Sequence, residues 1–476
     1  MPDFLSFINE ILWGSIMIYL LLGAGIWFTL RSGFIQFRSV RQFSKMIKNS
    51  AVPHSDGLTA FQALCTSFAA RVGSGNLAGV ALAIGMGGPG AVFWMWVTAV
   101  IGMATSFAEC SLAQLFKERD QHGQFRGGPS WYMARGLGMR WMGVLFSLLL
   151  LVAYGLIFNT VQANSVAHAL RYAFNCPEWL TGIGLALATL LTVSRGLKCV
   201  ARLMQWLVPV MALLWVAASL IVSVVHINQL PDVFSTIFSS AFGWREAASG
   251  ALGYTVSQAL TAGLQRGMFS NEAGMGSTPN AAAAAASWPP HPAAQGIVQM
   301  VGVFTDTMVI CSASAMIVLL AGPVTNDSGM AGIQLVQQAL VTLTGGWGAG
   351  FVALIIILFA FSSIVVNYLY AENNLIFLRC ASRRAIMLLR LGVILMVMSG
   401  ALLSMPLVWK LADVMMALMA ITNLTAILLL SPVVMLIVRD YRRQRLLGIQ
   451  PVFEASRYPE IASQIAPGTW NDLPRQ

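Results

Sequence analysis

The sequence is dominated by apolar segments that are each long enough to cross the hydrocarbon core of a membrane. A helix needs about 20 apolar residues to do so, and eleven segments reach that length. Hydrophobic residues make up 57% of the chain and charged residues only 10%, whereas about 25% of a typical soluble domain is charged. The sequence therefore predicts an all-α integral membrane protein with about 11 transmembrane helices. The expected spans are roughly 12–30, 58–86, 89–116, 141–170, 178–195, 201–225, 251–285, 292–322, 347–377, 386–405 and 409–438.

The lysines and arginines predict how these spans are oriented. Cytoplasmic loops of membrane proteins carry an excess of Lys and Arg. With the N-terminus outside, nearly all of the 28 basic residues fall in the connections that follow odd-numbered spans or in the tail 439–476. The outer side keeps only Arg171, Arg245 and Lys410. We therefore expect the N-terminus outside and the C-terminus in the cytoplasm.

The second span contains a polar interruption at its centre. Residues 66–80 read TSFAARVGSGNLAGV, so that Gly73, Ser74, Gly75 and Asn76 stand in the middle of an apolar run. Glycine and small polar residues disfavour helix. Irregular backbone at membrane depth is tolerated only where protein or a water-filled cavity surrounds it. The pattern predicts a discontinuous helix whose free amides and carbonyls face a ligand.

The seventh span repeats this interruption and runs through the membrane in the opposite direction. Polar and glycine residues fill 263–277, and each broken span is followed by four more spans. Two inverted units that each open on a discontinuous helix are typical of secondary transporters. The predicted organisation is a single transmembrane domain at 1–438, with an extra helix and basic connector at 1–56, five-helix repeats at 57–225 and 250–438, and a cytoplasmic tail at 439–476.

The ends of half-helices indicate what such a site can bind. A helix N-terminus presents free N–H groups and partial positive charge, which suit a carboxylate. Helix C-termini and unwound carbonyls suit an ammonium group or Na⁺. One zwitterionic amino acid therefore satisfies both kinds of end. Other intramembrane polar residues are candidates for substrate, ion or pairing contacts: Gln162, Asn164, Asp306, Ser362, Ser363, Glu372 and Asp413.

Two basic residues, Arg71 and Arg266, lie inside spans. A charge there is costly and by default marks function. The structural alternative is an ion pair within the bundle, with Glu109 or Glu272 as the expected partner.

Three connections are expected to carry structure of their own. The basic connector 32–56 predicts an interfacial helix with Phe34, Ile35, Phe37 and Val40 towards lipid. The outer connection 227–249 places Val233, Phe234, Ile237 and Phe238 at a spacing that favours one helical face. The connection 324–346 does the same with Ile333, Val336 and Leu340, and Leu335 lies beside them. These two outer segments either cap an outer cavity or pack on the bundle as solvated loops.

Several classes of function are disfavoured. The six cysteines have no CxxC spacing, which argues against a disulfide framework or zinc site. Neither HExxH nor GxSxG occurs, so the sequence does not predict an enzyme. The net charge of +10 is spread between apolar segments, unlike the clustered patch that nucleic-acid binding requires. A channel is expected to show repeated pore rings, which one pair of unequal breaks does not provide.

Four motifs carry a resemblance to a known family: VGSGNLAGVA at 72–81, QFRGGPSWYM at 124–133, QANS at 162–165 and RGMFSNEAGMGSTPNAAAAA at 266–285. With these, the chain resembles the alanine/glycine:cation symporter (amino-acid carrier) family and is close to enterobacterial sodium/alanine carriers. The resemblance implies a LeuT-like 5+5 inverted repeat with one extra N-terminal helix in a bacterial inner membrane. It also implies sodium-coupled import of alanine, glycine or D-alanine by alternating access.

The resemblance also assigns roles to residues. No organic cofactor is expected, and the implied partners are a small neutral amino acid, Na⁺ and the lipid bilayer, with no nucleic acid; the oligomeric state stays open. The alternative is proton coupling, with Glu272 as the titrating group. The implied substrate-binding residues are Gly73, Ser74, Gly75, Asn76, Gln162, Ser270, Asn271 and Gly274. The implied sodium site consists of the carbonyls of Ala69 and Val72 with the hydroxyls of Ser362 and Ser363. The gating or ion-pair residues are Arg71, Arg266 and Glu272.

Overall fold

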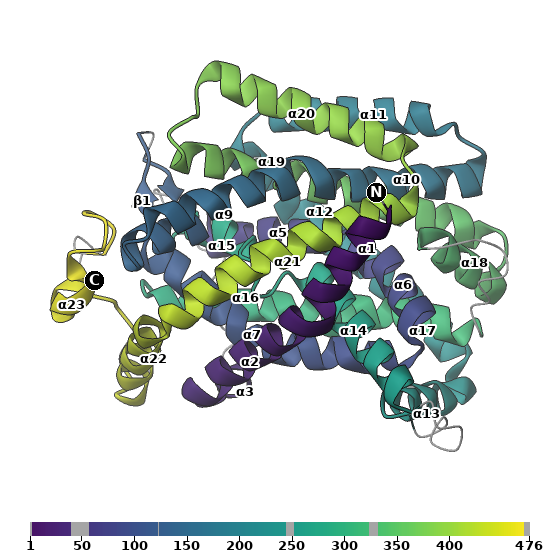
Figure 1. The fold of residues 1–476 in the computed structure, drawn as a ribbon, viewed down its shortest axis with the longest axis horizontal. Coiled ribbons are helices and arrows are strands. Elements are labelled where there is room, and N and C mark those ends of the chain that lie inside the picture. The colour runs from purple at the N-terminus through teal and green to yellow at the C-terminus, as the bar shows by residue number, and fades with distance from the viewer. Residues whose placement is uncertain (1, 40–56, 122, 244–251, 323–331, 471–476) are drawn as a thin grey trace.

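The computed structural model describes residues 2–39, 57–121, 123–243, 252–322 and 332–470 and is almost entirely helical (Figure 1). In this part of the chain, strand structure is limited to the antiparallel ribbon of β1 (Glu118–Arg119) and β2 (Phe125–Arg126). The helices follow the predicted spans in order, and short π-helical segments, labelled η, interrupt several of them.

The first six predicted spans correspond to α1 (Pro2–Ile11) with η1 (Leu12–Met17) and α2 (Ile18–Arg31); α5 (Ala60–Arg71) with η2 (Gly75–Gly79) and α6 (Val80–Gly87); α7 (Gly90–Leu115); α9 (Arg140–Val152) with η4 (Ala153–Ile157) and α10 (Phe158–Phe174); α11 (Glu178–Val193); and α12 (Leu197–Val225). The remaining five correspond to α14 (Leu252–Asn271) with α15 (Thr278–Ala283); α16 (Pro292–Phe304) with η7 (Thr305–Cys311) and α17 (Ser312–Leu320); α19 (Trp347–Phe377); α20 (Arg383–Leu402); and α21 (Met405–Leu429).

The number of membrane-crossing helices is lower than predicted when length and apolarity are both required. In the described residues, 8 helices meet both conditions, or up to 9 if the bent pair of α5 with η2 and α6 counts as one span. The helix α11 has 16 residues, fewer than the roughly 20 that a span needs, and α14 ends at a polar break. Every predicted span is occupied by helix, but the total of eleven is not confirmed.

The last span ends earlier than predicted. The expected segment 409–438 divides at Leu430, where α21 stops and a separate helix, α22 (Ser431–Leu446), begins. Pro432 stands in the first turn of α22, where its missing N–H costs no hydrogen bond. Figure 1 shows α22 turning away from α21 towards the C-terminal segment. The tail therefore begins with an ordered helix and not with an extended connection.

The predicted lipid-facing connector is wrong in one respect. The short helix α3 (Ile35–Arg38) exposes Phe34 and Phe37, whereas the side chain of Ile35 is buried. The helix packs beside α7, which explains why Ile35 turns inward. Val40 and the rest of this predicted helix lie outside the described residues.

The two connections that the sequence predicts to lie outside contain helices, but only one has the predicted face. In α13 (Leu230–Ala241), Val233 and Ile237 are buried while Phe234 and Phe238 are exposed, so the four do not share a buried face. In α18 (Ile333–Thr344), the predicted apolar residues are all buried against α17 and α19. The aromatic residues of α13 instead contact the rings of Phe93 and Trp96 on α7.

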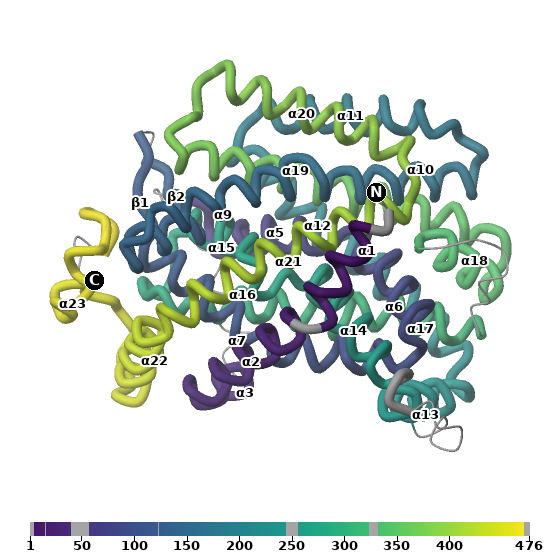
Figure 2. The backbone as a smooth tube through the Cα atoms, viewed as in Figure 1, coloured from purple at the N-terminus to yellow at the C-terminus, as the bar shows by residue number. Residues whose placement is uncertain are grey.

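Helix α7 is the centre of the packing around which both breaks are arranged. It contacts α14, α15 and α16, while the first span lies across α7 and α21 (Figure 2). Small residues allow these close contacts between helices: a Cβ on Gly263 of α14 would lie 2.5 Å from the Ala91 carbonyl oxygen. On the other side of the bundle, α10 packs on α19 and α20, and α11 packs beside α20 (Figure 1).

Candidate functional site

The first predicted break is present between α5 and η2, where the helix axis bends by 53°. In a continuous helix, the Gly73 N–H would donate to the Ala69 carbonyl. It donates instead to Asn76 Oδ1 at 3.1 Å. The side chain of Asn76 thus replaces a helical hydrogen bond and leaves the Ala69 carbonyl available to a neighbouring helix.

The carbonyl oxygens of α5 meet the two serines of α19. Ser363 Oγ lies 2.9 Å from the Ala69 oxygen and 3.4 Å from the Val72 oxygen, and Ser362 Oγ lies 3.5 Å from the Ala69 oxygen. Oxygens around a hard cation bound at about 2.4 Å are about 3.4 Å apart in octahedral geometry. Both hydroxyls also donate to the Phe359 carbonyl of their own helix. The four residues named for a sodium site therefore converge, and their neutral oxygens fit a hard monovalent cation.

Gln162 of α10 reaches the same break from another side. Its Oε1 accepts a hydrogen bond from the Ser74 amide at 2.9 Å. A Cβ on Gly73 would lie 2.6 Å from Ser363 Oγ and 2.7 Å from Gln162 Nε2. Gly73 therefore separates the serine hydroxyls from the glutamine, and a larger residue there would displace these side chains.

The Ser74 hydroxyl, at the first break, is a buried polar group without a partner among the described residues. The side chain is fully buried, and its oxygen has no hydrogen-bond partner in the part of the chain that the structure describes. Buried polar atoms are nearly always paired with protein, water or ligand. A polar group of a small bound molecule next to Ser74 would satisfy this hydroxyl.

The second predicted break is also present, between the end of α14 at Asn271 and the start of α15 at Thr278. Glu272 has φ 55°, and Gly274 and Gly276 have φ 82° and 86°. Glycine adopts this left-handed conformation without steric cost. Gly276 has a second reason to be glycine, because a Cβ there would lie 2.7 Å from the Phe146 ring.

A buried polar cluster connects the two breaks. Asn76 Nδ2 donates to Ser270 Oγ at 2.9 Å and to Asp306 Oδ1 at 2.7 Å. The Ser270 hydroxyl donates to the other carboxylate oxygen of Asp306 at 2.6 Å. Cys311 Sγ lies 3.0 Å from Ser270 Oγ. Each broken span thus contributes one side chain to a carboxylate on η7.

The sequence did not predict that Asp306 lies between the two breaks. The sequence identified it only as one of several intramembrane acids, without a partner. Its position inside the apolar run 292–322 was the available signal, since an acid at membrane depth marks function by default. The contact with Asn76 depends on how two helices distant in sequence are rotated, and no local pattern encodes that.

Two of the predicted substrate residues are not brought to this cluster. Asn271 Oδ1 accepts from the Ala273 amide at 3.0 Å, and its Nδ2 donates to Thr307 Oγ1 at 3.3 Å, so the side chain caps the end of α14. The Gly274 amide donates to Glu109 Oε1 at 3.2 Å. Both residues shape the second break and do not contact Asn76.

Asn164 also lies away from the breaks. Its Nδ2 donates to the carbonyls of Gly400 and Leu403, at 3.0 and 2.7 Å. Its amide holds α10 against the end of α20. The Asn164 Oδ1 atom has no hydrogen-bond partner among the described residues, and the expectation that it reaches a substrate stays a prediction.

The expected partners of both buried arginines are wrong. Arg266 forms two parallel hydrogen bonds with the Asp413 carboxylate, at 2.9 and 2.8 Å, and its guanidinium lies 4.6 Å from the centroid of the Trp409 ring. Glu109 accepts from Gly274 and Asn423. Glu272 accepts from Ser277 at 2.6 Å, one turn further along its own break.

Arg71 uses neutral partners. Its nitrogens donate to Thr278 Oγ1 at 3.1 Å, to Ser106 Oγ at 3.4 Å and to the Gln299 carbonyl at 3.4 Å. Thr278 is the first residue of α15, so Arg71 joins the end of one half-helix to the start of the other.

Aromatic residues enclose the first break on the side of α6. The ring of Phe269 lies 5.5 Å from that of Phe158 and 4.8 Å from that of Trp409. A Cβ on Gly75 would lie 2.8 Å from the Phe269 ring. These three aromatic side chains, here named the Phe269 wall, leave little room beside Gly75, which favours small ligands.

Backbone hydrogen bonds join the segment before α5 to the segment after α15, at the ends of these helices that lie away from the breaks. Leu58, just before α5, donates to the Ala284 carbonyl at 3.2 Å, and Ala286 donates back to the Leu58 carbonyl at 2.9 Å. Lys117 Nζ donates to the Ala285 carbonyl at 3.0 Å. No sequence pattern predicts this clasp, because backbone carbonyls of alanine residues are not distinguished by any local motif.

Comparisons with known proteins agree with this architecture. The model of the sodium:alanine symporter family matches residues 1–455. The chain is 67% identical to the uncharacterized transporter YaaJ of Escherichia coli over the full length of both chains. It is 38% identical to the sodium/alanine symporter AgcS of Methanococcus maripaludis, over 91% of this chain and 96% of that protein. The crystal structure of MhsT in complex with L-phenylalanine superposes with a TM-score of 0.55 at 15% identity, covering 88% of this chain and 95% of that chain. This last likeness confirms the predicted LeuT-like fold.

Proposed function

Because this chain belongs to the sodium:alanine symporter family, we propose that it couples the entry of Na⁺ to the import of alanine across a bacterial inner membrane. Glycine and D-alanine are the other expected substrates, and the N-terminus lies outside. The observation that carries the proposal is the junction of the two helix breaks, where Asn76 contacts both Ser270 and Asp306. Movement of the repeat 57–225 against the repeat 250–438 would expose this junction to each side in turn.

The groups around the first break suit a zwitterion beside a cation. The unpartnered Ser74 hydroxyl and the amide of Gln162 offer hydrogen bonds to an amino acid. The oxygens of Ala69, Val72, Ser362 and Ser363 offer neutral ligands to Na⁺. Because Gly73 separates the two sets, the proposed substrate and ion are neighbours.

The driving force from one sodium ion is sufficient for concentrative uptake. A charge that crosses 100 mV gains about 2.3 kcal/mol, and a tenfold Na⁺ gradient adds about 1.4 kcal/mol. Together these sustain a several-hundred-fold accumulation of a neutral amino acid, since each 1.4 kcal/mol is a factor of about ten.

The test is uptake of labelled alanine into proteoliposomes that contain the purified protein. We expect an inward Na⁺ gradient to drive accumulation, and unlabelled glycine and D-alanine to compete for it. Glutamine and leucine are expected to compete weakly, because the Phe269 wall restricts the space beside Gly75. Uptake that is equally fast without the Na⁺ gradient would contradict sodium coupling.

Proton coupling is the second candidate. It is supported by an excess of buried acidic side chains over buried basic side chains near the breaks. Three buried carboxyl groups interact electrostatically with Arg71: those of Glu109, Glu272 and Asp306. The other buried arginine, Arg266, is already paired with Asp413. Unbalanced charge at membrane depth is costly, so bound protons or a bound cation must offset the excess of acids. A pH step in Na⁺-free buffer, applied to the native protein and to Glu272→Gln, separates the two. Uptake driven by the pH step and lost in Glu272→Gln would favour protons.

Removing one proposed ligand is expected to weaken sodium binding selectively. Ser363→Ala deletes the hydroxyl nearest to the Ala69 and Val72 carbonyls. We expect the Na⁺ concentration for half-maximal uptake to rise about tenfold, which corresponds to about 1.4 kcal/mol. Ser363→Thr retains the hydroxyl and should stay near the native value. The matched control is Ser219→Ala, a buried serine that donates to the Ala313 carbonyl away from both breaks. An unchanged Na⁺ requirement in Ser363→Ala would remove this residue from the site.

A further inference from the structure

The C-terminal segment 452–470, here named the C-terminal cap, folds back onto the clasp between Leu58 and residues 284–286. It contains the 3-10 helix η9 (Ala455–Arg457) and the short α-helix α23 (Pro459–Ala462). Its large apolar residues are buried even though the segment follows the last span: Phe453, Ile461, Ile465 and Trp470. A tail with only a tethering role would not bury such residues, because their ordering costs conformational entropy.

The first anchor of the cap is the loop 284–291 that follows α15. The Phe453 amide donates to the Pro290 carbonyl at 2.9 Å. The Phe453 ring packs edge-on against the His291 ring, with centroids 5.6 Å apart, and it stacks on Tyr458. This loop also carries Ala284 and Ala286, the residues that pair with Leu58. The cap and the start of the first broken span thus hold the same loop.

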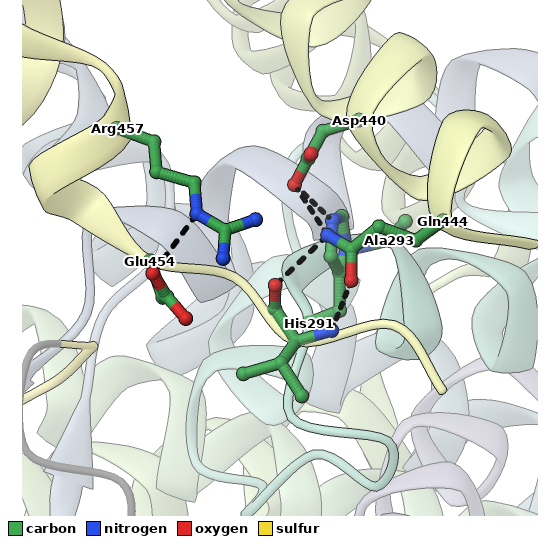
Figure 3. Close-up of polar contacts among 7 residues, drawn as sticks. His291, Ala293, Asp440, Gln444, Glu454 and Arg457 are labelled. Atoms are coloured by element: carbon green, nitrogen blue, oxygen red, sulfur yellow. Dashed lines mark hydrogen bonds and ion pairs between the residues drawn. The ribbon is translucent and has the colours of Figure 1, made fainter. Parts of the chain in front are cut away.

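Helix α22 supplies a second anchor, shown in Figure 3. Asp440 Oδ2 lies 3.1 Å from His291 Nε2, and Gln444 Nε2 donates to the same carboxylate oxygen at 3.0 Å. The Ala293 amide donates to His291 Nδ1 at 3.1 Å, which places the imidazole proton on Nε2, facing Asp440. Burial lowers the pKa of His291 below its usual value and favours this neutral form.

The third anchor is the end of α7. Trp470 Nε1 is within 3.2 Å of the carbonyls of both Gln114 and Leu115. Lys117 Nζ lies 5.0 Å from the centroid of the Trp470 ring and bonds the Ala285 carbonyl. The cap therefore covers the lysine that helps to hold the clasp. These bonds satisfy C-terminal helix carbonyls that otherwise lack partners.

The cap also connects two groups of helices. Through α22 it continues from α21, which packs on α9 and α10, while α22 and the cap lie against α7 and α16. Relative movement of these groups has to strain or break the cap contacts. We propose that the C-terminal cap is a latch: it stabilises the closed clasp between Leu58 and loop 284–291 and must be released before a substrate leaves towards the cytoplasm. This inference rests on the proposed transport function, because only a transporter needs this clasp to open.

The test is hydrogen–deuterium exchange of the purified full-length protein, with Trp470→Ala as the variant. The amides of Leu58 and Ala286 report on the clasp, and the amide of Phe453 reports on the cap. Losing the two indole hydrogen bonds and the buried ring is expected to speed exchange in peptides from all three regions by about tenfold or more. Peptides from α18, at the opposite end of the bundle, should exchange at the native rate. Trp206→Ala is the matched control, because Trp206 is 72% exposed on α12.

The outcomes divide clearly. Faster exchange in the cap with native exchange at Leu58 and Ala286 would overturn the latch, and so would equal acceleration everywhere, which indicates general destabilisation. If Trp470→Ala does not fold, Trp470→Phe and Phe453→Ala give the same comparison. In proteoliposomes, Trp470→Ala is expected to retain sodium-driven uptake and to release preloaded alanine several-fold faster than the native protein. If the native protein takes up no alanine, the proposed function fails, while the exchange result still decides whether the cap controls the clasp.

Discussion

Replacing Asn76 with alanine is expected to lower sodium-driven alanine uptake by about 100-fold or more. The substitution removes the donor to Asp306 and the acceptor for the Gly73 amide together. Each hydrogen bond to a charged group contributes about 1.5–3 kcal/mol, and the shape of the first break depends on the Gly73 contact as well. Initial rates in proteoliposomes, normalised to the amount of inserted protein, measure the effect.

The control for Asn76→Ala is Asn367→Ala. Asn367 is equally buried, on α19, and its amide donates to Asn159 Oδ1 at 3.0 Å. Among the described residues, no hydrogen bond joins it to Asn76, Ser270 or Asp306. We expect this variant to transport within a few-fold of the native rate. Near-native uptake by Asn76→Ala would refute the role assigned to the junction of the breaks.

The second large effect is expected on stability, from Arg266→Met. The substitution leaves the Asp413 carboxylate buried without its guanidinium partner. Removing one member of a buried ion pair typically costs about 3–5 kcal/mol. The expected result is a clearly lower midpoint of thermal unfolding in detergent. The measurement is the fraction of protein that remains monodisperse after heating to each temperature.

A double variant separates the charge from the space that it fills. Replacing both partners, as Arg266→Met with Asp413→Leu, is expected to recover most of the lost stability, because well-packed apolar pairs often equal a buried ion pair. Lys410→Met serves as the control: Lys410 lies one turn earlier on α21 and bonds Ser6 Oγ at 2.7 Å, at a partly exposed position. It should cost less than about 1 kcal/mol. A single variant as stable as the native protein would show that Asp413 is protonated or solvated.

The sequence located the two breaks because their signal is local. Glycine and small polar residues within an apolar run fix where a membrane helix ends, independently of its neighbours. The same reasoning found Asn76, Gln162 and Ser270, and the structure brings them to the first break and to the cluster that connects it with the second. The sequence named the serines of α19 only as possible contacts, and the family resemblance assigned them to a sodium site, since hydroxyls in membrane helices often bond their own carbonyls. Ser362 and Ser363 do this as well as reaching Ala69.

Contacts between distant segments could not be predicted. The pairing of Arg266 with Asp413 and of Asn76 with Asp306 depends on helix rotation and on which helices pack together.

The predicted end of the last span is wrong for a local reason. Helix α22 begins with the apolar run PVVMLIV, which hydropathy alone joins to the preceding span. The repeat boundaries at 57–225 and 250–438 stay a prediction.

The position of Gly73 has a thermodynamic consequence. Gly73 separates the serine oxygens of α19 from the side chain of Gln162, and a Cβ on Gly73 would contact both. Whatever binds on one side fixes the backbone on which the other side depends. Binding at two such sites is linked reciprocally, so that the factor by which Na⁺ raises the affinity for an amino acid equals the factor by which the amino acid raises the affinity for Na⁺. Cooperativity between ion and substrate would then need no signal across the protein, because one peptide unit belongs to both sites.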